Sequence, residues 1–337
     1  MTQELVIKTK KKRFRPIITV LNILLITLIW ILITLLGTVL LILHGPSNYI
    51  RGLFVTTVME TSAAKFLATG FLGEERVEEI LSQNTIVTFE ESTNTDLIDI
   101  PTEENIVEEE LNSIKIEDVS GSTFKGKMMI IRDPSRLYVG VTKNLGVSGE
   151  RTDKMVKRED AIGGVNAGGF LDEGGMGHGG DPLGIVMQHG KIISGGLDKR
   201  HNLIGFDNKN VLVLGNYTGQ EALDMGIRDA VSFGPFYIIN GEPAQAIGTG
   251  GGLNPRTVIG QRKDGTVLLL VIDGRQSSSL GATYKDCIDV MVEYGAYNAA
   301  NLDGGTSTVM VHEDKIINST FALYGAREVP TSFLIKK

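Results

Sequence analysis

Residues 256–275, RTVIGQRKDGTVLLLVIDGR, contain the pattern that decides the fold, and residues 298–308, NAANLDGGTST, repeat part of it. Two apolar runs rich in β-branched residues meet at Asp264-Gly265, which predicts a hairpin of two buried strands. Similar short apolar runs, separated by glycine-rich turns, recur from residue 121 to residue 337. We therefore expect an α+β domain over 121–337, built on a mixed or mainly antiparallel sheet with few helices.

Two helices are expected within this domain. Residues 152–159, TDKMVKRE, predict a short one. Residues 283–294, TYKDCIDVMVEY, open with a T-x-x-D capping box and are followed by Gly295, a residue typical of helix ends. Cys287 shares the apolar face of this second helix, so we expect it in the core and not as a nucleophile.

The N-terminal region predicts a membrane anchor. Residues 17–43 contain no charged side chain and could cross a bilayer core of about 30 Å as a helix. The preceding tail, residues 1–16, is basic, which predicts a cytoplasmic N-terminus and an extracellular C-terminal domain. A cleaved signal peptide is the alternative, but its apolar part usually spans only about 7 to 15 residues.

Two segments are expected between the anchor and the domain. Residues 44–83 predict a helical stalk, in which Val77, Ile80 and Leu81 form a narrow apolar stripe. Residues 84–120 are rich in acidic side chains, eleven of them against Lys115, which favours a solvated linker. The chain has a net charge of −7, concentrated after the basic tail, so we expect no general attraction to nucleic acid. Its single cysteine excludes an internal disulfide.

Asp273 and Asp303 are the candidate catalytic carboxylates. Each ends an apolar strand and precedes a glycine, so rigid structure would hold the carboxylate where a ligand can approach closely. The alternative is an ordinary turn, as we expect at Asp264-Gly265.

Further candidates have side chains that suit a glycan or an anion. Asn166 and Asn240 end apolar runs and could cap turns or bind sugar hydroxyls. The glycine-rich stretch 172–182, DEGGMGHGGDP, contains His178 and Asp181 and is expected to border a site. It lacks the Lys-Ser/Thr of a phosphate-binding P-loop.

Residues 125–335 contain five motifs in this order: NAGGF, GPFYIINGE, PRTVIGQRKDGTVLLLVIDGR, GAYNAANLDGGTSTVMV and REVPTSFLI. Through these motifs the chain resembles the phosphodiester glycosidase family. The family includes N-acetylglucosamine-1-phosphodiester α-N-acetylglucosaminidases and bacterial surface proteins labelled as exopolysaccharide biosynthesis proteins. Two departures stand out: NAGGF where the family usually has NAGFF or NGGFF, and DGGTS where it has DGGGSS. Substrate preference therefore need not follow the family.

The resemblance implies hydrolysis of a sugar that is linked through its anomeric carbon to a phosphodiester. Asp273 and Asp303 would stabilise or attack the oxocarbenium-like centre, and His178 or Glu242 would serve if a general acid is needed. Arg256 and Arg275 would hold phosphate oxygens. The expected substrate-binding residues are Asn166, Asp181, Asn240, Arg256, Arg275, Gly304, Thr306 and Ser307.

Three questions stay open at this point. A divalent cation could bind oxygen ligands from Asp273, Asp303 or Asp181, but no spacing requires it, and we predict no metal site. The domain could instead bind an anionic glycopolymer without cleaving it, or transfer sugar between phosphate-linked carriers. The expected partners are a phosphate-linked glycan of the cell envelope or an exopolysaccharide, and the membrane itself.

Overall fold

The computed structural model describes residues 14–61, 64–100, 112–172, 177–320 and 326–337. It shows an α+β fold in which the strand pairs among these residues are antiparallel, as the sequence predicts. The helices outside the sheets are α1 Phe14–His44, α2 Asn48–Met59, α3 Phe66–Leu72, α4 Glu74–Ser82, α6 Thr152–Arg158, α7 Gly219–Asp224 and α8 Tyr284–Glu293. Short 3-10 turns are η1 Thr95–Leu97, η2 Pro134–Arg136 and η4 Gly305–Ser307.

The largest sheet has seven strands in the order β1-β2-β14-β13-β15-β11-β12. Their bounds are β1 Ile114–Ser120, β2 Lys125–Ile131, β11 Phe236–Ile239, β12 Glu242–Pro243, β13 Arg256–Arg262, β14 Val267–Ile272 and β15 Ala296–Leu302. The hairpin expected at Asp264-Gly265 joins β13 to β14, and Gly265 has the positive φ of 82° that such a turn needs.

Two five-stranded sheets and one strand pair complete the β structure. One sheet has the order β7-β6-β10-β8-β9, with β6 Val186–Gln188, β7 Lys191–Ser194, β8 His201–Asp207, β9 Leu212–Tyr217 and β10 Ile227–Ser232. The other has the order β17-β16-β5-β19-β3, with β3 Leu137–Val141, β5 Gly163–Asn166, β16 Met310–His312, β17 Lys315–Ile316 and β19 Thr331–Ile335. The pair is β4 Glu150–Arg151 with β18 Glu328–Val329.

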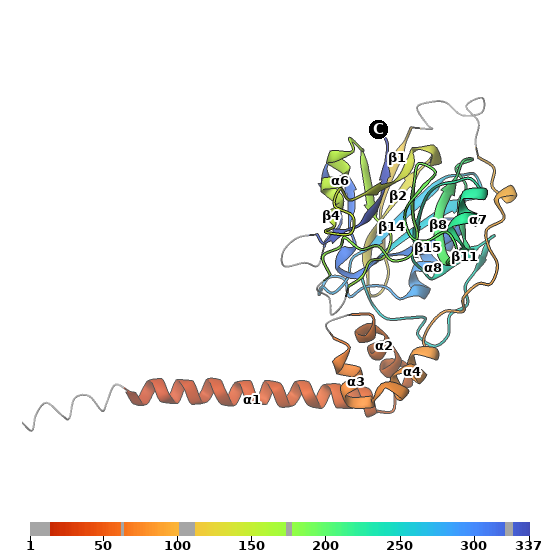
Figure 1. The fold of residues 1–337 in the computed structure, drawn as a ribbon. Coiled ribbons are helices and arrows are strands. Elements are labelled where there is room, and N and C mark those ends of the chain that lie inside the picture. Colours follow the sequence, from red (N-terminus) through yellow and green to blue (C-terminus); the bar gives the residue numbers. More distant parts are fainter. Residues whose placement is uncertain (1–13, 62–63, 101–111, 173–176, 321–325) are drawn as a thin grey trace, which may run out of the picture.

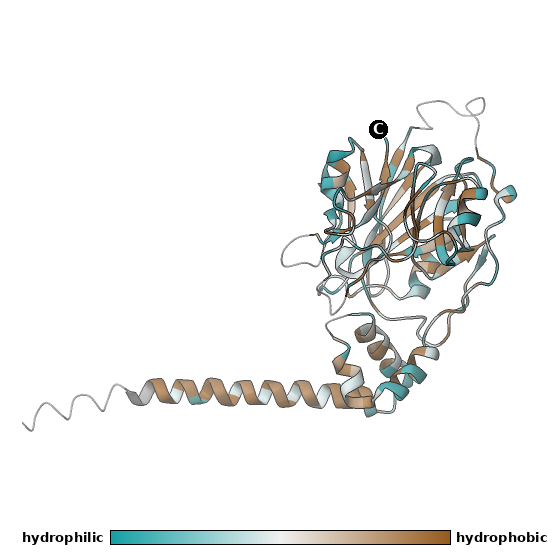
Figure 2. Cartoon of the chain, in the orientation of Figure 1, coloured by the Kyte–Doolittle hydropathy of each residue, from teal (hydrophilic) through white to brown (hydrophobic). Residues whose placement is uncertain are grey.

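The main core lies where the three large sheets face one another. Side chains such as Met129, Val165, Phe206, Leu269 and Phe333 meet there, all of them buried. Figure 2 shows these strands in hydrophobic colours inside a more polar outer layer. Burial of apolar area at about 25 cal/mol per Å² is the main force that holds such sheets face to face.

Helix α8 covers the other face of the seven-stranded sheet. Its N-cap Thr283 and Asp286 form the expected capping box, and its C-terminal turn is followed by Gly295, with φ of 76°. Cys287 is fully buried in the core between α8 and the sheet, as predicted from its helix face.

Helix α1 projects from the rest of the molecule and is apolar along its length (Figures 1 and 2). Residues Ile17–His44 are the one stretch, within the described chain, that is long and apolar enough to cross a membrane. Between α1 and the β structure lie α2, α3 and α4, which pack on one another and on the end of α1 through Leu43 of α1, Val55 of α2 and Val77 of α4.

The expectation of a solvated linker over 84–120 is wrong for the described part of that range. Ile86 bridges to Ala246, and the N–H of Thr93 donates to the carbonyl of Leu214 at 2.9 Å. Residues 114–120 form β1, an edge strand of the seven-stranded sheet. The acidic composition hid this strand because both of its faces carry charged side chains: Glu117, which pairs with Lys115, lies on one face, and Asp118, which pairs with Lys127, lies on the other. The most acidic portion, 101–111, lies outside the described residues.

Candidate active site

The pocket lies at one edge of the seven-stranded sheet. Because neighbouring strands are antiparallel, the start of β13 meets the ends of β14 and β15 at the same edge: Arg256 pairs with Ile272, and Thr257 pairs with Leu302. The loops that follow these strands enclose a cavity of about 380 Å³. Six charged residues line it: Glu60, Asp172, Arg256, Arg275, Asp303 and Arg327.

Asp303 follows β15 and presents its carboxylate to this cavity. Atom Oδ2 is buried and has no hydrogen-bond partner within the described ranges. Burial raises the pKa of the carboxyl group to about 6, while hydrogen bonds from Ser307 and the Gly304 backbone act against this shift. A buried, underpartnered carboxylate in a cleft is a candidate reactive group.

The backbone of Asp303 is fixed by Asn166, which is fully buried at the end of β5. The Asn166 Nδ2 donates to the Asp303 carbonyl at 2.5 Å, and its Oδ1 accepts from the Thr257 hydroxyl at 2.8 Å and from the Val309 N–H at 3.1 Å. The side chain therefore joins three segments next to the Asp303 carboxylate.

Arg275 follows β14 and enters the pocket from a strained backbone position. Its φ of 59° lies in the left-handed region, which non-glycine residues adopt at a cost of about 1 to 3 kcal/mol, often at functional sites. Its Nη2 donates to the Thr61 hydroxyl at 3.0 Å and to Asn254 Oδ1 at 2.9 Å. A Cβ added to Gly305 would lie 3.5 Å from this Nη2, so the loop that carries Asp303 borders the guanidinium. Burial, and then the nearby Arg256, lower the pKa of Arg275.

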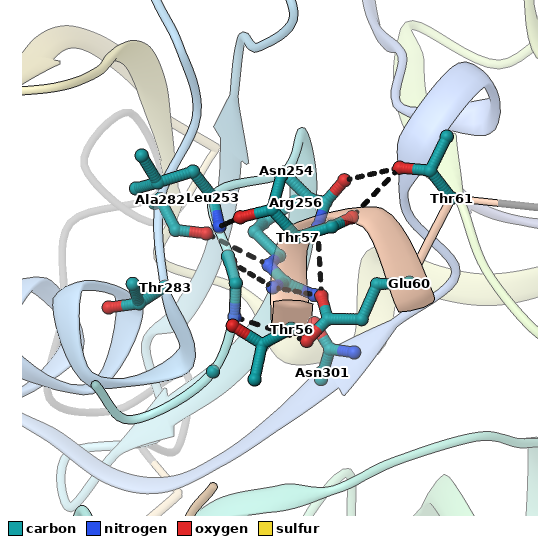
Figure 3. Close-up of polar contacts among 12 residues, drawn as sticks. Thr56, Thr57, Glu60, Thr61, Leu253, Asn254, Arg256, Ala282, Thr283 and Asn301 are labelled. Carbon is teal, nitrogen blue, oxygen red and sulfur yellow. Dashed lines mark hydrogen bonds and ion pairs between the residues drawn. The ribbon is translucent and has the colours of Figure 1, made fainter. Parts of the chain in front are cut away.

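Arg256 pairs with Glu60, the residue that caps the C-terminus of α2 (Figure 3). Its Nη2 lies 2.5 Å from Glu60 Oε2 and also donates to the Gly252 carbonyl at 2.7 Å. Its Nε donates to the Ala282 carbonyl at 3.1 Å, and the guanidinium stacks 4.1 Å from the Tyr284 ring centroid. Arg256 is thus both buried and engaged by protein groups.

Arg327 and Asp172 form the second charged pair of the pocket. Two parallel hydrogen bonds, of 2.8 Å and 2.5 Å, join the guanidinium to the carboxylate. The bond from Arg327 is the largest of the effects that lower the pKa of Asp172. The same guanidinium lies 4.8 Å from the ring centroid of Phe170, and Phe170 also lines the cavity.

These pairings leave two pocket charges without a salt bridge among the described residues. Glu60 neutralises Arg256, and Asp172 neutralises Arg327. Arg275 and Asp303 remain as one cation and one carboxylate that are available to a ligand. Phe170, Phe233 and Tyr284 add apolar area to the lining, and Asn301 adds an amide.

The structure brings together half of the site residues expected from the sequence. Those that line the pocket are Asp303, Arg256, Arg275, Gly304, Thr306 and Ser307. Those that are not part of its lining are Asp273, Asn166, Asn240, Glu242, His178 and Asp181. Asn166 nevertheless supports the site, as described above.

Asp273 is turned away from the pocket. Its Oδ1 accepts from the Ser319 N–H at 2.9 Å and from Asn318 Nδ2 at 3.1 Å, so it holds the segment after β17 against the end of β14. Burial raises its pKa, and those two hydrogen bonds lower it. Of the two Asp-Gly sites expected to act together, only Asp303 faces the cavity.

The other four residues outside the pocket lining either hold local structure together or lie toward solvent. Asn240 donates to the Ser92 carbonyl and accepts from the Asn94 N–H, which attaches the 92–94 segment to the sheet. Glu242 is exposed on β12. His178 and Asp181 lie 3.4 Å apart, with 55% and 40% of their side chains exposed, on the glycine-rich stretch whose residues 173–176 fall outside the described part.

Sequence reasoning missed Asp172, Arg327, Asn254 and Glu60. The first three stand inside or beside motifs already singled out: the glycine-rich stretch, REVPTSFLI and PRTVIGQRKDGTVLLLVIDGR. Glu60 had no such signal, because it lies in the segment expected to be a stalk. Among the described residues, no group of three or more His, Cys, Asp or Glu is placed to hold a metal ion.

Comparison with known proteins gives a family match and a fold match. The sequence profile of the phosphodiester glycosidase family matches residues 159–336, slightly more than half of the chain. An uncharacterized SPbeta prophage-derived protein of Bacillus subtilis (strain 168), YomE, is 29% identical over 197 residues, which cover 56% of this chain. The chain spans only 29% of the length of that relative.

Two solved structures share the fold. One is the zebrafish N-acetylglucosamine-1-phosphodiester α-N-acetylglucosaminidase catalytic domain, auto-inhibited by its pro-peptide, with a TM-score of 0.55, 18% identity and coverage of 67% of this chain and 82% of that one. The other is a protein from Burkholderia pseudomallei K96243, with a TM-score of 0.50, 17% identity and coverage of 64% and 74%. The predicted fold class and family resemblance are thereby confirmed.

Proposed function

Because this chain belongs to the phosphodiester glycosidase family, we propose that it hydrolyses the bond between the anomeric carbon of a sugar and a phosphodiester. One observation carries this proposal. The pocket holds one cation and one carboxylate that lack a salt bridge, Arg275 and Asp303, and a sugar-1-phosphodiester needs one of each.

Arg275 is the group that binds the phosphate. A guanidinium offers two parallel donors to two phosphate oxygens, and Thr61 and Asn254 already hold this one in place. Thr306, on the turn next to it, supplies a hydroxyl donor.

Asp303 acts at the anomeric carbon. Cleavage of the C1–O bond develops positive charge on the sugar ring, and an ionised carboxylate stabilises or attacks that centre. With a pKa of about 6, the group is mostly ionised at neutral pH. The departing phosphomonoester is a good leaving group, so this scheme does not depend on a strong general acid.

The aromatic side chains of the pocket give the sugar an apolar surface. Phe170 and Phe233 suit the C–H face of a pyranose, and the Asn301 amide suits its hydroxyl or acetamido groups. Which sugar fits depends on the loop around Thr306, where this chain departs from the usual family sequence.

We further propose that α1 anchors the enzyme in a membrane with the catalytic domain outside the cell. The helix is long and apolar enough, and basic residues precede it. The substrates would then be phosphate-linked glycans of the cell envelope or an exopolysaccharide.

The test is release of free sugar from a synthetic α-N-acetylglucosaminyl phosphodiester by the full-length protein in detergent. Wild type should release N-acetylglucosamine, and Asp303→Asn should abolish release while the circular dichroism spectrum is unchanged. Asp264→Asn is the matched control, because it makes the same change at an Asp-Gly pair in a hairpin turn. Binding without release would favour a glycopolymer-binding module, and transfer to an added acceptor in place of release would favour a transferase.

A further inference from the structure

Glu60 comes from the membrane-proximal helices, yet it forms part of the wall of the catalytic pocket (Figure 3). It follows α2, only a short distance in sequence from the end of α1 at His44. The contact is closely fitted, because a Cβ on Gly252 would lie 2.4 Å from the Thr57 backbone nitrogen. The Leu253 N–H also donates to the Thr57 hydroxyl at 2.9 Å. The 252–254 loop therefore has room for α2 only because position 252 is glycine.

The Glu60 carboxylate binds three groups of this loop and strand. Oε1 accepts from the Gly252 N–H at 3.2 Å, and Oε2 accepts from Asn254 Nδ2 at 2.9 Å and from Arg256 Nη2 at 2.5 Å. The carboxylate accepts from the amide nitrogen of Asn254, which leaves the amide oxygen to face Arg275. Glu60 thus neutralises one arginine and orients the residue that holds the other.

Arg256 was expected to bind the substrate phosphate, and its contacts argue against that role. Its donors reach Glu60 and two backbone carbonyls, and its face is covered by Tyr284. With Glu60 in place, the charge that the pocket offers to an anion is that of Arg275 alone.

We propose that Glu60 is a positioning residue that sets the charge specificity of the pocket. By neutralising Arg256, it makes the pocket favour a phosphodiester, which has one negative charge, over a phosphomonoester, which has two. This inference rests on the proposed function. A terminal phosphomonoester is close to dianionic above pH 7, since its second pKa is about 6. The phosphomonoester formed by hydrolysis would carry that second charge and would therefore leave more readily.

The open cavity favours this role over that of a plug. A volume of about 380 Å³ remains with Glu60 and Thr61 in its wall. An inhibitory segment would fill the place of the ligand, whereas these two residues leave Arg275 and Asp303 facing open space.

The experiment compares Glu60→Gln with Glu78→Gln, which makes the same charge change at an exposed position of α4 in the same helical cluster. The two probes are the methyl phosphodiester of α-N-acetylglucosamine 1-phosphate and α-N-acetylglucosamine 1-phosphate itself, at pH 7.5. Affinity is measured by calorimetry in an Asp303→Asn background, and kcat/KM is measured in the active protein. The binding measurement remains informative even if no hydrolysis occurs, so failure of the two proposals can be told apart.

We expect the protein with Glu60 to prefer the diester, and Glu60→Gln to shift the diester-to-monoester affinity ratio at least about tenfold toward the monoester. Glu78→Gln should leave the ratio unchanged, and Glu60→Asp should retain most of the preference. The double variant Glu60→Gln/Arg256→Gln restores the net charge of the pocket and should return the ratio toward the original value.

Two results would overturn the proposal. An equal loss of affinity for both probes in Glu60→Gln would show a structural role only. An equal gain for both probes, with higher activity, would show that the α2 segment inhibits the site. If Glu60→Gln does not fold, the double variant decides: an unaltered ratio supports the charge account, and a ratio shifted toward the monoester refutes it.

Discussion

The side-chain amide of Asn166 donates a hydrogen bond of 2.5 Å to the backbone carbonyl of Asp303. Asn166 ends β5 and Asp303 follows β15, and these strands belong to different sheets, so one buried amide joins the two sheets next to the Asp303 carboxylate. The other half of the amide accepts from Thr257 and from the Val309 backbone.

We expect Asn166→Ala to destabilise the protein by about 2 to 4 kcal/mol, because it leaves buried backbone groups of Asp303 and Val309 without partners. It should also lower kcat, since Asp303 loses its anchor. Denaturant unfolding and sugar-release kinetics check both effects. Asn216→Ala, at an exposed position on β9, is the control and should change stability by less than about 0.5 kcal/mol. Equal stability of the two variants would contradict the assignment.

Asp303→Asn should remove activity and raise stability at the same time. Folding raises the pKa of this group from 3.8 to about 6, so the folded state binds the proton more tightly than the unfolded chain does. The stability contribution is therefore lost as pH rises from about 4 to about 6, and neutral Asn avoids a cost of up to about 3 kcal/mol at pH 7. Thermal unfolding at pH 4 and pH 7 measures this: the gain in Tm over wild type should be larger at pH 7. A lower Tm than wild type at pH 7 would argue against a costly buried carboxylate.

The pH profile of kcat/KM should show an acidic limb near pH 6. Below that pH, Asp303 is protonated and can no longer stabilise positive charge at the anomeric carbon, so the rate should fall about tenfold per pH unit. The pKa of Asp172 is lowered, mainly by Arg327, so its own limb should appear at lower pH. A rate that rises as pH falls through 6 would instead identify protonated Asp303 as a general acid.

Arg275→Ala should separate phosphate binding from sugar binding. We expect kcat/KM for the phosphodiester to fall by about 10² to 10³, because the variant loses the cation that faces the cavity without a salt bridge. Affinity for the uncharged sugar alone should change much less. Calorimetry with free N-acetylglucosamine and with the phosphodiester, in the same variant, makes the comparison. Equal losses for both ligands would place Arg275 in a purely structural role.

Local pattern was enough to predict α6, α8 and the β13–β14 hairpin of the C-terminal domain, but not the short helix α7. The Asp264-Gly265 turn, the capping box at Thr283 and the buried face of Cys287 depend on neighbours within one or two helical turns or one hairpin. Neighbouring residues in the sequence determine such short-range interactions, and the structure agrees with all three predictions. The strand at 114–120 was missed because its charged residues lie on both faces, which gives it the composition of a linker.

The candidate site could be predicted only in part, because a strand end shows where a residue lies but not which way its side chain points. Asp273 and Asp303 have the same local sequence context. Asp273 nevertheless accepts hydrogen bonds from the segment at 318–319, whereas Asp303 faces the cavity. The pairing of Arg256 with Glu60 joins positions nearly two hundred residues apart, and no local pattern encodes it.

The membrane-proximal helices should be required for the stability of the pocket as well as for anchoring. A chain that begins at Ile86 would lack Glu60, and buried Arg256 would lose its carboxylate partner, a change that costs about 3 to 5 kcal/mol in comparable ion pairs. A chain that begins at Gly45 also lacks α1 but keeps α2, α3 and α4, and it serves as the control. We expect the Gly45 chain to unfold at nearly the same denaturant concentration as the full-length protein in detergent, and the Ile86 chain to unfold at a clearly lower one.

Addition of Arg256→Gln should recover part of the stability of the Ile86 chain, because it removes the unpaired charge, and should destabilise the Gly45 chain, because it breaks the pair with Glu60. If Arg256→Gln has the same effect in both chains, then Glu60 and Arg256 are not coupled, and the membrane-proximal helices serve the anchor alone.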